Sequence, residues 1–329
     1  MSVASETTPT LHAAAASAHP APRVAVLVPC YNEEVTIASV IADFRKVLPG
    51  ATIYVYDNNS RDRTTEVARA SGAVVGRETL QGKGNVIRRM FADIEADVYV
   101  LVDGDATYHA PSATEMVELL LAERLDMVNG TRITEIEAAY RPGHRLGNLV
   151  LTGIVRVIFG DRIKDMLSGY RVFSRRFVKT FPALSGGFET ETEFTVHALE
   201  LGMPIGEVET PYRERPPGSQ SKLNTIRDGI RILLTIMRLV KEERPLQFFA
   251  VSGALLFVVS VLLGVPLVAE FARTGLVPRF PTAILATGLM GLAFLSFTCG
   301  LILDSVSRGR TEVKRLAYLA VPLYSRDDP

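Results

Sequence analysis

Two carboxylates spaced for metal binding, Asp103 and Asp105, stand on either side of Gly104 after the apolar run 98–102. Acids two residues apart on a turn can share one hard divalent cation, and Mg²⁺ or Mn²⁺ accepts such oxygens while leaving positions for a diphosphate. An Asp-Gly hairpin turn is the alternative, but residues 106–111 do not alternate in polarity as a returning strand would. We therefore predict a metal site at Asp103 and Asp105.

Three further polar segments follow or lie near strand-like runs, at residues 29–34, 57–60 and 82–85. Tyr31 and Asn32 can contact a base or ribose, and residues 82–85 can bring backbone amides and a lysine to a phosphate. Turns and helix caps would also account for such residues, and the glycines of 82–85 match neither a P-loop nor a full dinucleotide fingerprint. With the acidic pair, the segments predict a donor site made of Pro29, Tyr31, Asn32, Glu33, Asp57, Asn59, Gly82, Lys83, Asp103, Gly104 and Asp105.

Cations later in the chain could bind anionic oxygens. The arginine fork is rigid, always charged and well shaped for phosphate. A solvated charged loop is the alternative for any one of these residues. The predicted anion-binding set is Arg132, Arg171, Arg213, Arg215, Ser221 and Lys222.

The elements that must position these residues alternate between strands and helices. Apolar runs at 24–28, 53–56, 73–75 and 98–102 predict strands, and helical spacing marks 37–48, 64–70 and 86–94. This order predicts an α/β fold, a largely parallel sheet with helices on both faces, whose ligands bind at the carboxyl ends of the strands. The less regular part, 126–223, predicts a strand near 126–129 and helices near 147–159 and 192–201.

The last third of the chain predicts membrane attachment. Residues 245–269 and 280–303 carry no charge, and each run is long enough to cross a hydrocarbon core of about 30 Å. Basic residues flank the outer ends, so we expect the catalytic domain and both termini in the cytoplasm. Residues 224–244 predict an amphipathic basic helix, which would lie on an anionic membrane surface or pack as an ordinary surface helix.

The composition narrows the class of protein further. Lys and Arg together number 36, as do Asp and Glu, and the zero net charge argues against a nucleic-acid-binding protein with a basic surface. The two cysteines cannot build a disulfide framework or a cysteine zinc site. Residues 1–22 lack Lys and Arg and have only a short apolar patch, which predicts a disordered tail and not a signal peptide.

Taken together, these motifs resemble those of family 2 glycosyltransferases, which have the GT-A nucleotide-sugar-binding fold. The chain looks most like their polyprenyl-phosphate branch, which includes dolichyl-phosphate mannose synthases and bacterial enzymes with a similar two-span tail. The resemblance covers roughly 23–223. The matching residues are Pro29, Tyr31, Asn32 and Glu33 in the opening motif, Asp57 in the second-strand motif, and Asp103 and Asp105 in the DXD motif.

Three positions depart from the family pattern. Cys30 stands where the family often has Thr or Ala, and Asn58 and Asn59 replace the usual second Asp and Gly. Thr107 stands where many members have Gln after the DXD motif. The last change bears on metal or donor binding and not on the class of reaction.

The resemblance implies inverting transfer of a hexose from a nucleotide-diphosphate sugar to polyprenyl phosphate, with Mg²⁺ or Mn²⁺, at the bacterial inner membrane. The predicted anion-binding residues would then hold the acceptor phosphate. The expected organisation is a disordered tail (1–22), a GT-A catalytic domain (23–223), an interfacial helix (224–244), a transmembrane hairpin (245–304) and a cytoplasmic basic tail (305–329).

Two acidic segments remain open to more than one interpretation. Asp165 lies in a segment that resembles the family's acceptor segment and is the candidate base. Because an acceptor phosphate is already anionic, Asp165 could instead orient other groups, or it could be a surface acid in a turn. Glu189, Glu191 and Glu193 alternate, and for most of them we favour acids that open a helix; the resemblance allows one to face the donor.

Other functions are also considered. A non-lipid acceptor and a non-catalytic scaffold of the same fold remain alternatives. Processive polysaccharide synthases usually carry a Gln-x-x-Arg-Trp motif, and this chain has no Trp. A nicotinamide oxidoreductase is disfavoured by the missing third glycine. Small residues in the spans could pack against further copies of the chain, namely Gly253, Gly264, Gly288 and Gly291.

Overall fold

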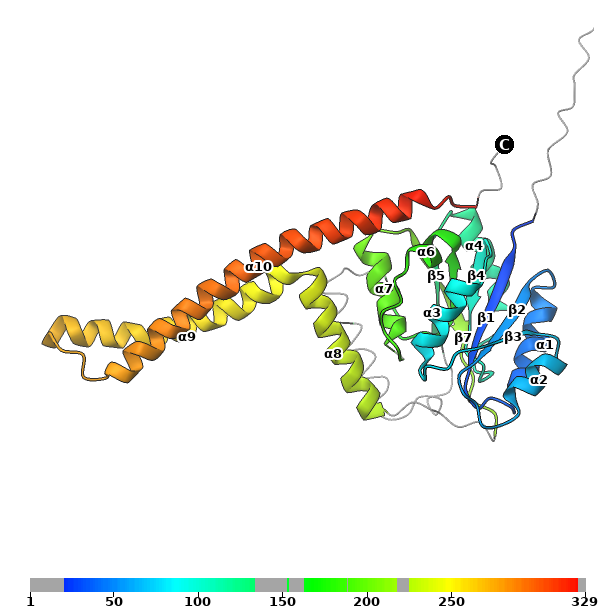
Figure 1. Cartoon of the computed structure of the whole chain (residues 1–329), viewed down its shortest axis with the longest axis horizontal. Coiled ribbons are helices and arrows are strands. Elements are labelled where there is room, and N and C mark those ends of the chain that lie inside the picture. Colours follow the sequence, from blue (N-terminus) through cyan, green and yellow to red (C-terminus); the bar gives the residue numbers. More distant parts are fainter. Residues whose placement is uncertain (1–20, 134–152, 154–162, 188, 218–224, 325–329) are drawn as a thin grey trace, which may run out of the picture.

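The computed structural model describes residues 21–133, 153, 163–187, 189–217 and 225–324, and it is built on a seven-stranded sheet (Figure 1). The strand order is β3-β2-β1-β4-β6-β5-β7, and neighbours pair in parallel except for β6, which is antiparallel to β4 and β5. The predicted largely parallel α/β sheet is confirmed. The strands are β1 (Val24–Cys30), β2 (Thr52–Asp57), β3 (Val74–Arg77), β4 (Val98–Leu101), β5 (Met127–Ile133), β6 (Arg171–Ser174) and β7 (Ile205–Pro211).

Helices cover both faces of the sheet, as the alternating pattern predicted. One face buries Phe44 and Met116 against the central strands, and the other buries Met90, Phe177 and Phe194 in an aromatic layer. The first face carries α1 (Ile37–Val47), α2 (Thr64–Ala70) and α4 (Ser112–Ala122), and the second carries α3 (Lys83–Asp93), α6 (Arg175–Thr180) and α7 (Thr190–Glu200).

The strand register brings the predicted site segments to one edge. Cys30 lies opposite Asp57, and Leu27 lies opposite Leu101, so the chain leaves β1, β2 and β4 at the same side of the sheet. The predicted strand at 126–129 is longer than expected, because β5 continues to Ile133 along β7. Strands β6 and β7 and helices α4 and α6 were not predicted from the sequence, and the helix predicted near 147–159 lies outside the described residues except for residue 153.

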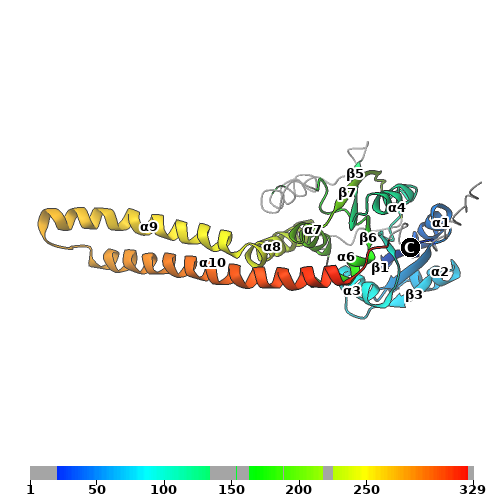
Figure 2. The same ribbon diagram turned by 90° about the horizontal axis from the view of Figure 1, so that it is seen from above.

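Three long helices follow the sheet domain: α8 (Thr225–Glu243), α9 (Pro245–Thr274) and α10 (Phe280–Ala320). The last two form a hairpin that projects away from the sheet (Figures 1 and 2). Small residues let them approach, since Ser260 Oγ donates to the Ala286 carbonyl at 2.7 Å and a Cβ at Gly253 would lie 3.1 Å from the Ala293 carbonyl. Gly253 therefore packs within the hairpin, whereas Gly264, Gly288 and Gly291 have open space around them.

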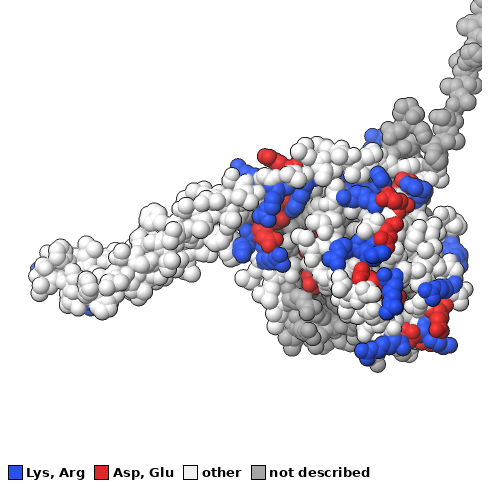
Figure 3. Space-filling view, viewed as in Figure 1, with Lys and Arg blue, Asp and Glu red and all other residues white. Residues whose placement is uncertain are grey.

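Both hairpin helices are long and apolar enough to cross a membrane. Their apolar side chains are mostly exposed, as at Val251 (72%) and Leu262 (69%), which is unlike the core helices of a soluble domain. Figure 3 shows the hairpin almost without charged side chains along its length, whereas charges gather where it joins the sheet domain. These features support the predicted pair of membrane spans.

The segment predicted as a basic tail, 305–329, is helical as far as Ala320. Helix α10 continues without a break to Ala320 and returns to the sheet domain (Figure 2). Tyr318 Oη donates to Asp126 Oδ2 at 2.8 Å, and the Arg176 guanidinium lies 4.2 Å from the centre of the Tyr318 ring. Lys314 Nζ lies 2.7 Å from Glu200 Oε2 on α7. Tyr318 and Lys314 thus dock the helix onto acids of the domain.

Helix α8 occupies the place predicted for an amphipathic helix. Ile236 is buried against Met166 of the sheet domain. The opposite side is apolar yet exposed, because Ile230, Leu234 and Met237 are each at least half accessible. The side chains of 225–229, 231 and 232 lie outside the described ones. An apolar surface left open beside a membrane hairpin suits contact with lipid.

Candidate active site

The loops after β1, β2 and β4 form one connected rim. Asn32, which has a positive φ of 54°, receives a hydrogen bond at Oδ1 from the Arg61 amide, and its own amide donates to Ser60 Oγ. Thr36 Oγ1 donates to the Gly104 carbonyl at 2.7 Å. The segment 31–36, which holds the predicted donor residues Tyr31, Asn32 and Glu33, is thus tied to the loops after β2 and β4.

The residues of the second-strand motif hold the loops of the rim by hydrogen bonds. Asp57 is buried and accepts from the Ser60 amide. Asn58 Oδ1 accepts from the Gly82 amide at 2.7 Å, while its Nδ2 donates to the Leu80 carbonyl at 2.8 Å. This departure from the family pattern has a clear structural role, since one asparagine amide holds the loop that precedes α3.

The glycines at 82 and 84 are explained by close packing. A Cβ at Gly82, whose φ is +132°, would lie 2.0 Å from the Gly186 carbonyl, and one at Gly84 would lie 2.2 Å from the Ser185 carbonyl. From the sequence, these glycines were interpreted as part of a phosphate-binding loop. In the structure, glycine is needed at both positions because the backbone of residues 185–186 comes so close that a Cβ would not fit.

Lys83 is buried between two acids and does not point freely into solvent. Its Nζ lies 2.5 Å from Asp103 Oδ1 and 2.6 Å from Glu191 Oε1. Burial disfavours the ammonium, but Asp103 and Glu191 together raise the pKa of Lys83 above its usual value. Burial also raises the pKa of Glu191. Glu191 lies in the first turn of α7, as a helix-opening acid would, and it also pairs with Lys83 beside Asp103. Its alternating acidic neighbours were the available signal in the sequence.

Asp105 is buried and held by two groups. Its Oδ1 accepts from the Thr107 amide at 3.1 Å and from Thr107 Oγ1 at 2.6 Å, and its Oδ2 lies 2.5 Å from Arg215 Nη2. Burial and Asp103 raise the pKa of Asp105, and Arg215 opposes that shift. Thr107, the residue that replaces the usual Gln, thus fixes the orientation of the carboxylate.

Asp103 and Asp105 offer the kind of oxygen ligand that a hard divalent cation prefers. A Cβ at Gly169 would lie 2.6 Å from Asp103 Oδ2, so only glycine at that position leaves room beside this oxygen. Among the described residues, no group of three or more His, Cys, Asp and Glu is placed to hold a metal. Two carboxylates would fill part of the coordination of Mg²⁺ or Mn²⁺ and leave the rest to phosphate oxygens and water.

The predicted anion-binding residues have different surroundings in the structure. Arg215 joins the acidic pair, as described above. Arg132 is paired with Asp165, since Nε lies 2.7 Å from Oδ2 and Nη2 lies 2.9 Å from Oδ1. Ser221 and Lys222 lie outside the described residues.

Arg171 does not fit its predicted role. Its side chain is fully buried, and it donates to the carbonyls of Ser168 and Met166 and to Thr195 Oγ1. Burial lowers the pKa of Arg171 to about 10. The guanidinium satisfies backbone acceptors of the 165–168 turn, so this arginine supports the fold beneath the rim and does not reach a ligand above it.

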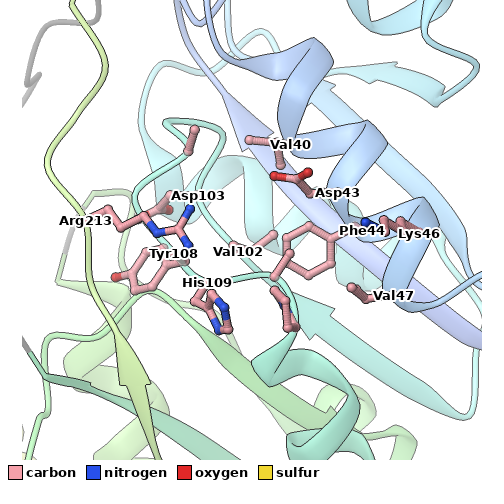
Figure 4. Close-up of a pocket in the computed structure, with 13 residues that line it drawn as sticks. Val40, Asp43, Phe44, Lys46, Val47, Val102, Asp103, Tyr108, His109 and Arg213 are labelled. Atoms are coloured by element: carbon pink, nitrogen blue, oxygen red, sulfur yellow. The ribbon is translucent and has the colours of Figure 1, made fainter.

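Arg213 lies at a pocket beside the rim. The pocket has a volume of about 240 Å³ and lies between α1 and residues 102–111 (Figure 4). In Figure 4, Arg213 lies near Asp103 and Tyr108, and Asp43 faces them from α1. The Arg213 amide donates to the Thr107 carbonyl, which ties the loop after β7 to the loop of the acidic pair.

The sheet topology and the acidic pair beyond β4 define a nucleotide-sugar-binding fold of the GT-A type. The model of glycosyl transferase family 2 matches residues 25–181. Glycosyltransferase AglJ of Haloferax volcanii is 38% identical over 236 residues, which are 70% of this chain and 76% of that protein. The chain therefore belongs to glycosyl transferase family 2, and it is a glycosyltransferase.

Two further relatives extend the comparison. A dolichyl-phosphate hexose transferase of Haloferax volcanii is 29% identical, over 67% of this chain and 95% of its own. The solved glucosyl-3-phosphoglycerate synthase of Mycobacterium tuberculosis, in complex with Mn²⁺, UDP and phosphoglyceric acid, superposes with a TM-score of 0.54 at 25% identity. That superposition covers 66% of this chain and 78% of the synthase.

Proposed function

We propose that this protein transfers a hexose from a nucleotide-diphosphate sugar to a polyprenyl phosphate, with inversion at the anomeric carbon. The observation that carries the proposal is the contact of Asp105 with Arg215 at 2.5 Å, because it joins the acidic pair to the basic loop after β7. The donor and acceptor sites would then meet at one point of the rim. Two similar proteins support the proposal: the dolichyl-phosphate hexose transferase on the side of the acceptor, and the solved synthase in complex with Mn²⁺ and UDP-glucose on the side of the donor.

Residues of the rim would bind the donor. The β1 and β2 loops would hold the nucleoside, with Tyr31 and Asn32 at its base or ribose. When bound, a divalent cation at Asp103 and Asp105 would neutralise the diphosphate and stabilise the departing nucleotide. Lys83, held by Glu191, adds a positive charge beside Asp103.

The basic side chains next to the rim would place the acceptor phosphate. Arg132 is held by both oxygens of Asp165, which fixes its fork at the end of β5. Arg213 and Arg215 lie on the loop that ties to the acidic pair. Because the acceptor oxygen is already anionic, correct placement opposite the leaving group matters more than removal of a proton. Asp165 is therefore assigned a positioning role.

The membrane hairpin supports a lipid acceptor. Helix α8 leaves its apolar side open near the junction of the hairpin and the catalytic domain, and it would lie in the interface between headgroups and acyl chains. Basic residues flank the outer ends of both spans, which favours a catalytic domain on the cytoplasmic side. The phosphate of a polyprenol held in that leaflet would be at the level of the domain.

The test is a transfer assay with the purified full chain in detergent. With Mn²⁺ or Mg²⁺, the wild type should move radiolabel from a nucleotide sugar to a polyprenyl phosphate, and Asp105→Ala should abolish transfer. A short-chain polyprenyl phosphate should compete with the long-chain acceptor. Transfer to a soluble acceptor that this lipid does not inhibit would overturn the lipid assignment, and unchanged turnover of Asp105→Ala would overturn the metal assignment.

A further inference from the structure

Glu207 lies on β7, the last strand of the sheet, and one of its oxygens accepts from three donors. In the strand register Glu207 lies opposite Asn129 of β5. Its Oε1 accepts hydrogen bonds from Asn129 Nδ2 at 3.2 Å, from Thr131 Oγ1 at 3.2 Å and from the Lys164 amide at 2.8 Å. Two of these donors belong to β5, and the third belongs to residues 163–168, which precede β6. The Glu207 carboxylate therefore joins that segment to β5.

The same segment carries Asp165, which contacts Arg132. The Asp165 carbonyl accepts from Asn129 Nδ2 at 2.9 Å, so one side-chain amide bonds both to Glu207 and to the backbone next to Lys164. The Asp165 carboxylate accepts from the Arg132 guanidinium at both oxygens, and its Oδ2 also accepts from the Arg132 amide at 3.3 Å. A displacement of the segment would therefore move Asp165 and, with it, the guanidinium.

The residue that follows β7 reaches Arg132 as well. The guanidinium carbon lies 5.5 Å from the centre of the Tyr212 ring, a distance at which the ring attracts a cation. The Tyr212 amide donates to the Ile133 carbonyl at 2.9 Å, which continues the pairing of β5 with β7 beyond the last residue of β7. This side of the sheet thus supports Arg132 twice, directly through the Tyr212 ring and through Glu207 and Asp165.

The charge and burial of Glu207 make its hydrogen bonds strong ones. A carboxylate is a stronger acceptor than a neutral group, and water has little access to the donors on β5, since Asn129 is buried and Thr131 is only 8% exposed. The charge has a second effect. Burial lowers the pKa of Arg171, and several carboxylates that include Glu207 oppose this shift. Loss of the carboxylate would remove one acceptor from three donors and a negative charge from the surroundings of a buried arginine.

We propose that Glu207 is a positioning residue for the acceptor phosphate. It holds residues 163–165 against β5, and Asp165 in turn fixes the direction of the Arg132 guanidinium. The inference rests on the proposed function, in which Arg132 binds the phosphate of the lipid. Glu207 acts through these residues and neither contacts the phosphate nor takes a proton. It was not among the predicted site residues, because its contact with Lys164 spans 43 residues of sequence.

The first test measures hydrogen exchange at residues 163–168 of the full chain in detergent. Glu207→Ala removes the acceptor of the Lys164 amide, so exchange there should become about tenfold faster than in the wild type. Glu207→Gln keeps an oxygen at this place and should restore most of the protection. Glu209→Ala is the matched control, because Glu209 is an exposed acid two residues further along β7. Equal exchange in the wild type and in Glu207→Ala would overturn the anchoring of the segment.

The second test measures binding of farnesyl phosphate, a short polyprenyl phosphate, by calorimetry in the presence of Mn²⁺ and UDP. Glu207→Ala should bind it about tenfold more weakly than the wild type, whereas its affinity for UDP with Mn²⁺ should be unchanged. Glu207→Gln should recover most of the farnesyl phosphate affinity, and Glu209→Ala should equal the wild type. In an Arg132→Gln background, Glu207→Ala should cause no further loss, because its effect passes through Arg132.

Three results of the second test would contradict the positioning role. They are an unchanged farnesyl phosphate affinity in Glu207→Ala, equal losses of farnesyl phosphate and UDP affinity, and a further loss in the Arg132→Gln background. A wild type that does not bind farnesyl phosphate would overturn the lipid acceptor of the proposed function, and the exchange comparison would still decide whether Glu207 anchors residues 163–168. Thermal melting checks that each variant is folded.

Discussion

Arg132 and Asp165 form a two-point ion pair, in which Nε lies 2.7 Å from Oδ2 and Nη2 lies 2.9 Å from Oδ1. Both side chains are nearly buried, at 15% and 5% exposed. The carboxylate that family resemblance marks as a base thus has both oxygens engaged by the arginine at the end of β5. Asp165 fixes where that guanidinium points, a role that kinetics of variants can separate from proton abstraction.

Asp165→Asn should raise the KM for the lipid acceptor and lower kcat/KM by about 10- to 100-fold, because Arg132 loses its fixed orientation. Arg132→Gln should have a similar effect, and the double variant should be little worse than either single one. Steady-state kinetics with varied acceptor provide the measurement. A loss confined to kcat, with the acceptor KM unchanged and the acid limb of the pH profile removed, would indicate a base instead.

Glu191→Gln should weaken donor binding. The variant leaves buried Lys83 with one acid in place of two, so its charge is balanced by Asp103 alone and opposes a cation there more strongly. We expect the donor KM to rise about tenfold and the Mn²⁺ dependence to shift to higher concentration. Glu118→Gln, on the exposed side of α4, is the control. Identical donor kinetics in both variants would argue against a role for Glu191.

Gly84→Ala should destabilise the catalytic domain. The new Cβ would lie 2.2 Å from the Ser185 carbonyl and 2.3 Å from Thr190 Oγ1, so the start of α3 must move from α7. We expect a loss of about 2–4 kcal/mol, seen as a lower Tm. Gly50→Ala, with nothing within 4 Å of the added atom, should melt close to the wild type. A wild-type Tm for Gly84→Ala would show that the two segments separate freely.

His197 should make the domain less stable in mild acid. Burial lowers the pKa of this histidine from 6.5 to about 4, so the folded protein holds it neutral. Between these values the unfolded chain binds a proton that the folded protein does not, and stability therefore falls as the pH falls. The loss should reach about 2 kcal/mol at pH 5.

His197→Leu tests the same point, because leucine suits a site beside Phe177 and Phe181 and cannot be protonated. Thermal melting in detergent at pH 7.5 and pH 5 should show a smaller drop for the variant than for the wild type. An equal drop in both proteins would assign the acid sensitivity to other groups.

Much of the architecture could be predicted because it depends on local pattern. Buried parallel strands are continuous apolar runs, and a membrane span is a long uncharged one, so the first four strands and both hairpin helices were found from neighbouring residues. The acidic pair was found for the same reason, since Asp103 and Asp105 are close in sequence and follow a strand. Strand β6 was missed, because four residues paired between two antiparallel neighbours have no pattern of their own.

The partners of the site residues were decided by the tertiary structure alone. Lys83 pairs with Glu191, which is 108 residues away in the sequence, and Arg132 pairs with Asp165, which is 33 residues away. The order of strands in the sheet brings the segments that carry these residues to the same side of the domain. The same packing buries Arg171, although its sequence neighbours suggested a ligand contact. The charges and spacing of residues in the sequence indicate which side chains can bind an anion or a cation. Only the folded chain determines which of them already hold each other, since an ion pair needs two side chains at one place in space.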